Sequence, residues 1–205
     1  MNIPSPAEFK EGYHAFQRRE RRDAMYRIAT FLVDHFWGSP SEMADGLGVL
    51  LLTWNQAFYR YGRFDFDRLE ECIFRNLNLL QEYRERNILS YSPTDDKSIR
   101  HLFQQFLAAL QICEGKKKGT RSPVAVSKAL HLLAPAFFPL WDVEIARAYH
   151  CRYNYNPVDK YLTFLKRMRR MARELQLVVD PQETSKTLLK LIDEYNYAKF
   201  TKGWI

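Results

Sequence analysis

Apolar residues recur every three to four positions along most of this chain, with polar residues between them. That spacing puts the apolar side chains on one face of an α-helix, which can then pack against other helices. The clearest example is residues 65–87, whose predicted inward positions are Phe66, Leu69, Ile73, Leu77 and Leu80. No stretch carries a convincing strand pattern. The sequence therefore predicts an all-α fold.

The expected helix boundaries follow from proline and capping residues. Ser39–Pro40 and Ser122–Pro123 are typical helix starts, because serine caps free N–H groups and proline suits the first helical position. About eight helices are predicted, at roughly residues 6–36 (with or without a break), 40–61, 65–87, 95–114, 122–135, 143–150, 158–177 and from Asp180 onwards. We expect one domain, 1–205, or two helical lobes with a cleft near residues 53–60 and 121–149.

The predicted helix 122–135 is mostly apolar, yet it carries a polar stripe. Ser127, Lys128 and His131 are separated by steps of one, three and four, so they share one face. One interpretation is that this stripe is the solvated side of an amphipathic helix. The other is that a buried helix carries a functional lysine and histidine.

The segment that follows adds a carboxylate. Pro139-Leu140-Trp141-Asp142 ends one element, and Asp142 is placed to cap the helix 143–150. An ordinary cap would explain Asp142 by itself. Together, a lysine on a buried helix, a short turn and Pro-x-x-Asp resemble the signature of the helix-hairpin-helix DNA glycosylases, in particular their 8-oxoguanine glycosylase branch.

This resemblance implies a catalytic pair and a substrate class. Lys128 would be the nucleophile that forms a Schiff base with the sugar of a flipped nucleotide, and Asp142 the essential carboxylate. The activity would be base excision with an AP lyase step, on 8-oxoguanine by family analogy. The absence of the family's hairpin glycines favours a divergent member instead, whose target is another modified base, such as a hypermodified base of phage DNA, so both DNA repair and phage defence are expected roles. The expected walls of the base pocket, each with core packing as its alternative, are Trp54, His131, Trp141 and Tyr149.

The contacts with DNA are expected from two other segments. Family members carry a glycine-rich hairpin before the lysine, whereas residues 123–127 contain no glycine. The basic loop 114–121 is expected to replace part of that hairpin, with a solvated loop as the alternative. The residues concerned are Lys116, Lys117, Lys118 and Arg121. Asn55 and Arg60 match the polar stretch that the family inserts into DNA beside the flipped nucleotide.

Composition agrees with a polyanionic partner. Lys and Arg number 31 against 24 Asp and Glu, giving a formal net charge of +7. The three scattered cysteines form no zinc or iron–sulfur motif and are typical of reduced thiols. No segment has the length of apolar sequence that a membrane span needs. We expect a cytoplasmic, DNA-binding protein without a cofactor, metal or obligate protein partner.

Two other functions compete with the glycosylase hypothesis. The first is a non-catalytic helical module that binds nucleic acid through the basic loop and the basic face of helix 158–177. The second is a helical protein-interaction domain with no nucleic-acid role.

Overall fold

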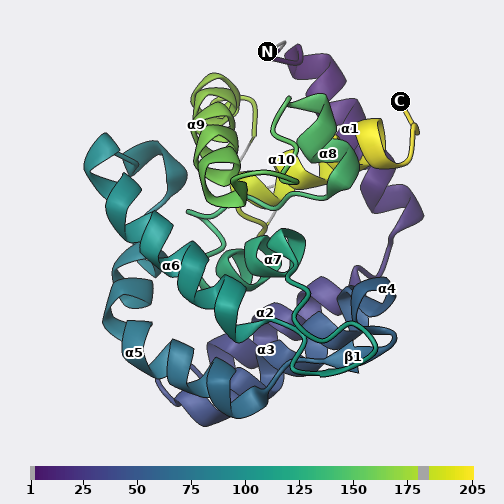
Figure 1. The fold of residues 1–205 in the computed structure, drawn as a ribbon. Helices are drawn as coiled ribbons and strands as arrows, with labels where there is room; N and C mark the ends of the chain where they lie inside the picture. The colour runs from purple at the N-terminus through teal and green to yellow at the C-terminus, as the bar shows by residue number, and fades with distance from the viewer. Residues whose placement is uncertain (1–2, 180–184) are drawn as a thin grey trace.

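The computed structural model describes residues 3–179 and 185–205 (Figure 1). Ten α-helices lie within these residues, which confirms the all-α prediction and exceeds the expected eight. They are α1 (Pro6–Arg19), α2 (Ala24–His35), α3 (Pro40–Trp54), α4 (Gln56–Tyr59), α5 (Phe66–Arg84), α6 (Asp96–Ala109), α7 (Pro123–Leu133), α8 (Val143–Ala148), α9 (Pro157–Leu175) and α10 (Leu188–Asn196). Shorter turns are η1 (Ile88–Ser90), η2 (Pro93–Asp95) and the π-helical η3 (Tyr197–Thr201).

Two of the additional helices arise where an expected long helix breaks. The first expected helix divides into α1 and α2 at a charged stretch that ends in Asp23, which adopts a left-handed conformation with a φ of 39°. The second divides into α3 and α4 at Asn55. Each break lets the two halves pack on different partners: α1 lies along α10, whereas α2 packs on α3.

Two further expectations need correction. The described residues include two short strands, β1 (Gly62–Arg63) and β2 (Glu114–Gly115), which pair antiparallel and hold the basic loop against the segment after α4. They are too short to show a strand pattern in the sequence. The last helix begins at Leu188, where the Thr187 hydroxyl accepts a hydrogen bond from the Lys190 backbone N–H at 3.2 Å. The expected start at Asp180 lies outside the described residues.

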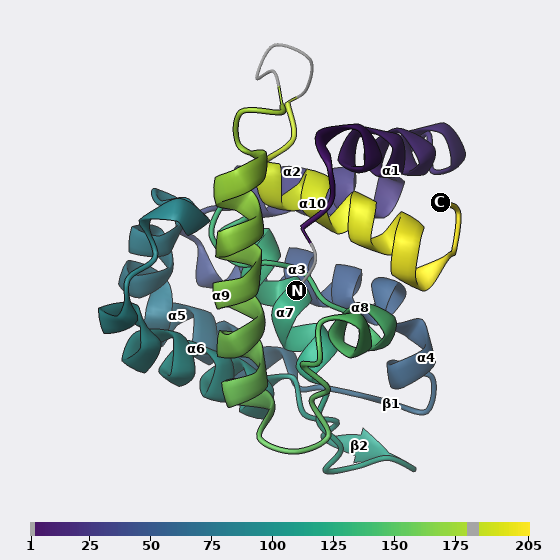
Figure 2. The same cartoon turned by 90° about the horizontal axis from the view of Figure 1, so that it is seen from above.

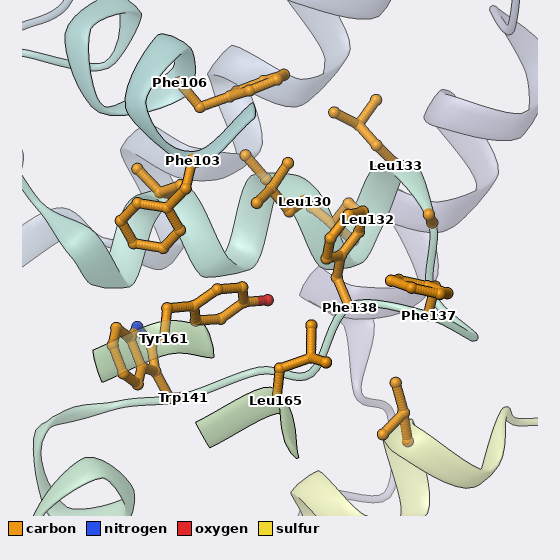
Figure 3. Packing of buried hydrophobic residues seen from close by; sticks show 14 of the residues in the cluster. Phe103, Phe106, Leu130, Leu132, Leu133, Phe137, Phe138, Trp141, Tyr161 and Leu165 are labelled. Carbon is orange, nitrogen blue, oxygen red and sulfur yellow. The ribbon is translucent and has the colours of Figure 1, made fainter. Parts of the chain in front are cut away.

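Helix α7 is the centre of the packing (Figures 1 and 2). It contacts α2, α3 and α6, while α6 and α10 both contact α9. Figure 3 shows aromatic and leucine side chains from α6, α7, α9 and the α7–α8 connection meeting in one apolar layer. Ser127 and His131 are fully buried, so the solvated-stripe interpretation of this helix is wrong.

Candidate active site

A cavity of about 220 Å³ lies where α2, the end of α3, α7, the start of α8 and α10 come together. Lys128 and Asp142 both line it, so the fold brings the two sequence-predicted catalytic residues to one site. Glu20, Ala24 and Met25 also line it and are exposed, so the cavity opens to solvent beside them. The arginines that flank Glu20 in the sequence are exposed as well: Arg18, Arg19, Arg21 and Arg22.

Lys128 reaches out of the central helix to the end of α3. Its Nζ donates hydrogen bonds to the Trp54 carbonyl oxygen at 3.1 Å and to Asn55 Oδ1 at 2.7 Å. The nitrogen also lies 4.5 Å from the centroid of the Trp54 ring. Trp54 is the last residue of α3, so its carbonyl has no partner within the helix and is available to the lysine.

Burial is the dominant influence on the charge of this lysine. It lowers the pKa of Lys128 to about 8, against the opposing attraction of Asp193 and, more weakly, of Asp142. A helix C-terminus such as that of α3 also favours the ammonium form, so it cannot be a cause of the lowered pKa. At pH 7 about one lysine side chain in ten is then a neutral amine, compared with fewer than about one in a thousand at the ordinary pKa.

Asp142 is held firmly at the start of α8. Its Oδ1 accepts a hydrogen bond from the Ile145 N–H at 2.8 Å, which is an N-cap, and its Oδ2 accepts one from the Thr201 hydroxyl at 2.6 Å. The capping interpretation is therefore correct for one oxygen. The same carboxylate lines the cavity that Lys128 lines, so the cap also fixes the position of Asp142 in the cavity wall.

The same cavity carries a second group of charges that the sequence analysis did not single out. Lys190 is 2 % exposed, and its Nζ lies 3.4 Å from Asp23, 3.5 Å from Asp193 and 3.7 Å from Glu194. Burial opposes the charged form of Lys190, but these three carboxylates outweigh it and raise its pKa. Burial raises the pKa of Asp193 to about 6 despite the attraction of Lys190.

Carboxylates outnumber amines along the cavity. Glu20, Asp23, Asp142 and Asp193 line it together with only two lysines, Lys128 and Lys190. One Asp23 oxygen is buried and makes no hydrogen bond, although it lies within ion-pair distance of Lys190. Such a wall suits a ligand that donates hydrogen bonds or carries positive charge, because the acceptors are already in place.

The four aromatic and histidine candidates for the base pocket divide into two pairs. Trp54 and Trp141 line the cavity, although Trp141 is 1 % exposed and donates its indole N–H to the Pro123 carbonyl at 3.2 Å. Tyr149 and His131 are buried and do not line the cavity. The Tyr149 hydroxyl donates to Asn196 Oδ1 at 2.7 Å, so this tyrosine is a core residue.

His131 is also a core residue, and it ties α7 to its neighbours. Its Nδ1 lies 2.7 Å from the Phe138 carbonyl oxygen and its Nε2 lies 3.1 Å from the Tyr26 hydroxyl. The carbonyl is only an acceptor, so Nδ1 carries the proton and Nε2 accepts from the tyrosine. Complete burial lowers the pKa of His131 to about 3, and the side chain is neutral.

The basic residues predicted to contact DNA lie on the surface beside the α3–α4 junction. The backbone N–H of Lys116 donates to the Tyr61 carbonyl at 3.1 Å, which brings the basic loop next to Arg60. Arg60, Lys116, Lys117, Lys118 and Arg121 are all exposed. A second hollow of about 340 Å³ lies beside this group and includes Arg121, Trp54 and Asn55 in its lining. Asn55 itself is turned inward and is only 9 % exposed.

Asp23, Asp193 and Lys190 are the site residues that the sequence analysis missed. Asp193 follows Lys190 by three positions on an amphipathic helix, which is the usual spacing of a surface ion pair. Asp23 stands at the end of a charged run before an apolar helix, as an ordinary N-cap does. Neither pattern signals burial, so the sequence offered no clue to their place in a cavity.

Comparison of the chain with protein-family models, with curated proteins and with solved structures gives no match. No helix in residues 3–179 and 185–205 combines the length and apolarity needed to cross a membrane. In the same part of the chain, no three His, Cys, Asp or Glu side chains are grouped as metal ligands.

Proposed function

We propose that this protein is a DNA glycosylase that excises a modified base and uses Lys128 for an associated AP lyase step. The observation that carries the proposal is that Lys128, partly buried and partly neutral at pH 7, shares one cavity with Asp142. A lysine on the central helix and an aspartate 14 positions later have no structural need to meet at a cavity. Their convergence is what a Schiff-base mechanism requires.

The chemistry begins with the neutral amine. Its lone pair attacks C1′ of the flipped nucleotide, a carbon–nitrogen bond forms, and the glycosidic bond breaks with its electron pair leaving on the base. One N–H of the nitrogen then leaves its acceptor and gives its proton to a cavity carboxylate, which passes it to O4′ as the C1′–O4′ bond breaks and the protonated Schiff base forms. Transfer of a C2′ proton to that carboxylate then forms the C2′–C3′ double bond, and the C3′–O bond breaks with its electron pair leaving on the 3′ phosphate. Asp142, fixed by two hydrogen bonds, stabilises the positive charge that develops on the sugar.

Charge on the surface supports a DNA substrate. The formal net charge is +7 although the cavity lining is rich in carboxylates, so the excess of cations lies outside the cavity. Exposed arginines flank the lining residue Glu20 in the sequence, and a second basic group lies beside the α3–α4 junction. Contacts of this kind with several phosphates make binding strongly dependent on salt.

The lining of the cavity also bears on the base. Trp54 and Trp141 offer ring surfaces, and Asp23 and Asp193 offer acceptors. A modified base whose added groups donate hydrogen bonds fits this lining better than one that adds only acceptors. An amine- or hydroxyl-bearing hypermodified base of phage DNA fits this lining, and so does 8-oxoguanine, the base given by family resemblance, because its oxidation adds an N7–H donor.

Borohydride trapping tests the proposal directly. Wild type, Lys128→Gln and Lys97→Gln are incubated with duplexes that carry an abasic site, 8-oxoguanine or amine-bearing and hydroxyl-bearing pyrimidines. Lys97 is exposed on α6 and serves as the matched control. A covalent adduct is expected with wild type and Lys97→Gln but not with Lys128→Gln. The trapping rate should rise with pH and level off above about 8, because only the neutral amine attacks.

Absence of any adduct would refute the lyase step. If wild type then bound DNA in a salt-dependent way, the non-catalytic nucleic-acid-binding module would be the better description. Without such binding, the protein-interaction domain would be favoured instead.

A further inference from the structure

The break between α3 and α4 creates a pair of acceptors for Lys128. After Trp54 the chain leaves the helix, and the N–H groups of Phe58 and Tyr59 bond the Asn55 carbonyl at 2.9 and 3.1 Å. The Trp54 carbonyl is thereby left for the lysine. The Asn55 side chain turns in the same direction and presents Oδ1 to the same nitrogen at 2.7 Å.

These two acceptors determine where the reactive lone pair of Lys128 lies. A neutral amine has two N–H groups and one lone pair. Two fixed acceptors, at 3.1 and 2.7 Å, engage both N–H groups. Neither acceptor is a base near neutral pH, so neither takes a proton from the nitrogen. The lone pair therefore occupies the remaining tetrahedral position of the nitrogen, and this position is free to point into the cavity that Lys128 lines with Asp142 and Asp193.

The identity of the Asn55 side chain matters as much as its position. Its oxygen must face Lys128, because the opposite orientation would set N–H groups against each other. The other atom of the amide, Nδ2, is buried and makes no hydrogen bond. A neutral amide stabilises the ammonium form of the lysine much less than a carboxylate at this distance, which would hold the lysine protonated.

We propose that Asn55 is a positioning residue that, together with the Trp54 carbonyl, holds the N–H groups of Lys128 and directs its lone pair into the cavity. The sequence resemblance gave Asn55 a different role, as a residue inserted into DNA. The inference rests on the proposed function only for the identity of the electrophile. The state of Lys128 itself can be measured without DNA.

The test compares an amide-to-carboxylate change at two neighbouring positions. Wild type, Asn55→Asp and Gln56→Glu are labelled with trace acetic anhydride across a range of pH, and the reactivity of Lys128 is measured by mass spectrometry against exposed Lys97. Gln56 is exposed at the start of α4, so Gln56→Glu adds the same charge one residue away. The pH midpoint for Lys128 should rise by at least about one unit in Asn55→Asp and stay nearly unchanged in Gln56→Glu.

A second measurement uses function. At pH 7 and saturating abasic DNA, trapping by Asn55→Asp should fall about tenfold with an unchanged Kd for DNA, since the neutral fraction of Lys128 falls about tenfold. Asn55→Ala removes the acceptor without adding charge and should also slow trapping with unchanged Kd. This variant covers the case in which Asn55→Asp fails to fold.

Three outcomes would overturn the inference. One is a pH midpoint of Lys128 labelling that shifts equally in Asn55→Asp and Gln56→Glu, or that shifts in neither variant. Another is weaker DNA binding by Asn55→Ala with an unchanged trapping rate at saturation, which would assign Asn55 to DNA contact. The third is a Lys128 midpoint near that of Lys97 in the wild type. Failure of wild type to trap DNA refutes the proposed function but leaves the labelling result to decide the role of Asn55.

Discussion

Replacing His131 with glutamine should remove a specific acid sensitivity of the fold. His131 is fully buried on α7, between the Phe138 carbonyl and the Tyr26 hydroxyl. It is neutral in the folded protein because burial lowers its pKa to about 3. In the unfolded chain the imidazole has its ordinary pKa of 6.5 and takes up a proton at moderately acidic pH.

The sign and size of the effect follow from proton binding. The unfolded state binds more protons between pH 6.5 and 3, so the stability due to His131 is complete above that window and falls through it. From pH 7 to pH 5, protonation of the unfolded imidazole costs about 2 kcal/mol. Since pH 5 lies well above the folded pKa, this loss depends almost entirely on the ordinary pKa of histidine.

Urea unfolding at pH 7 and pH 5 measures this loss. The difference between the two free energies of unfolding should be about 2 kcal/mol larger in wild type than in His131→Gln. Other titrating groups contribute equally to both proteins and cancel. His101→Gln, at an exposed position of α6, is the matched control and should behave like wild type. Equal pH dependence in wild type and His131→Gln would refute the assignment of a buried neutral histidine.

Two more predictions concern the structure around the site. Lys190→Met should cost about 3–5 kcal/mol in urea unfolding, because it removes the cation that pairs with buried Asp193 and leaves Lys186 as the remaining ion-pair partner of Asp23 and Glu194. Lys199→Met, which loses a partly exposed ion pair, should cost less than about 1 kcal/mol. Similar losses in the two variants would contradict the buried-cluster assignment. Gly115→Ala should lower the free energy of unfolding by at least about 1 kcal/mol more than Gly119→Ala does. Both glycines have positive φ (90° and 88°), but only at Gly115 would a Cβ lie 2.2 Å from the Tyr61 carbonyl oxygen. Faster hydrogen exchange at the Lys116 amide in Gly115→Ala alone would support this, and equal exchange in both variants would argue against it.

Much of the fold could be predicted because its signals are local. Helices α5, α6 and α9 lie within a few residues of their predicted limits, since each has an apolar repeat bounded by caps or proline. The breaks at Asp23 and Asn55 were less visible. Both depend on which partner each half-helix packs against. The β1–β2 pairing was missed for a similar reason, because two residues from each of two distant segments carry no strand pattern.

The candidate site was predictable in part. Lys128 and Asp142 stood out through a motif resemblance, and the structure brings both to one cavity. His131 and Tyr149 were chosen for chemical type, yet both are satisfied by hydrogen bonds within the core. Residue type shows which groups of a side chain can react or form hydrogen bonds. Only the neighbours in the fold show whether those groups are already hydrogen-bonded within the core.

By itself, the sequence determined the helical class, most helix limits and the basic charge, because periodicity, capping and charge are properties of short segments. The tertiary structure decided that Lys128 and Asp142 line one cavity and that the Asn55 amide accepts a hydrogen bond from Lys128. It also decided that Asp23, Asp193 and Lys190 line the same cavity. Burial and charge pairing between α2, α3, α7 and α10 depend on how distant helices pack, and no local pattern encodes that arrangement.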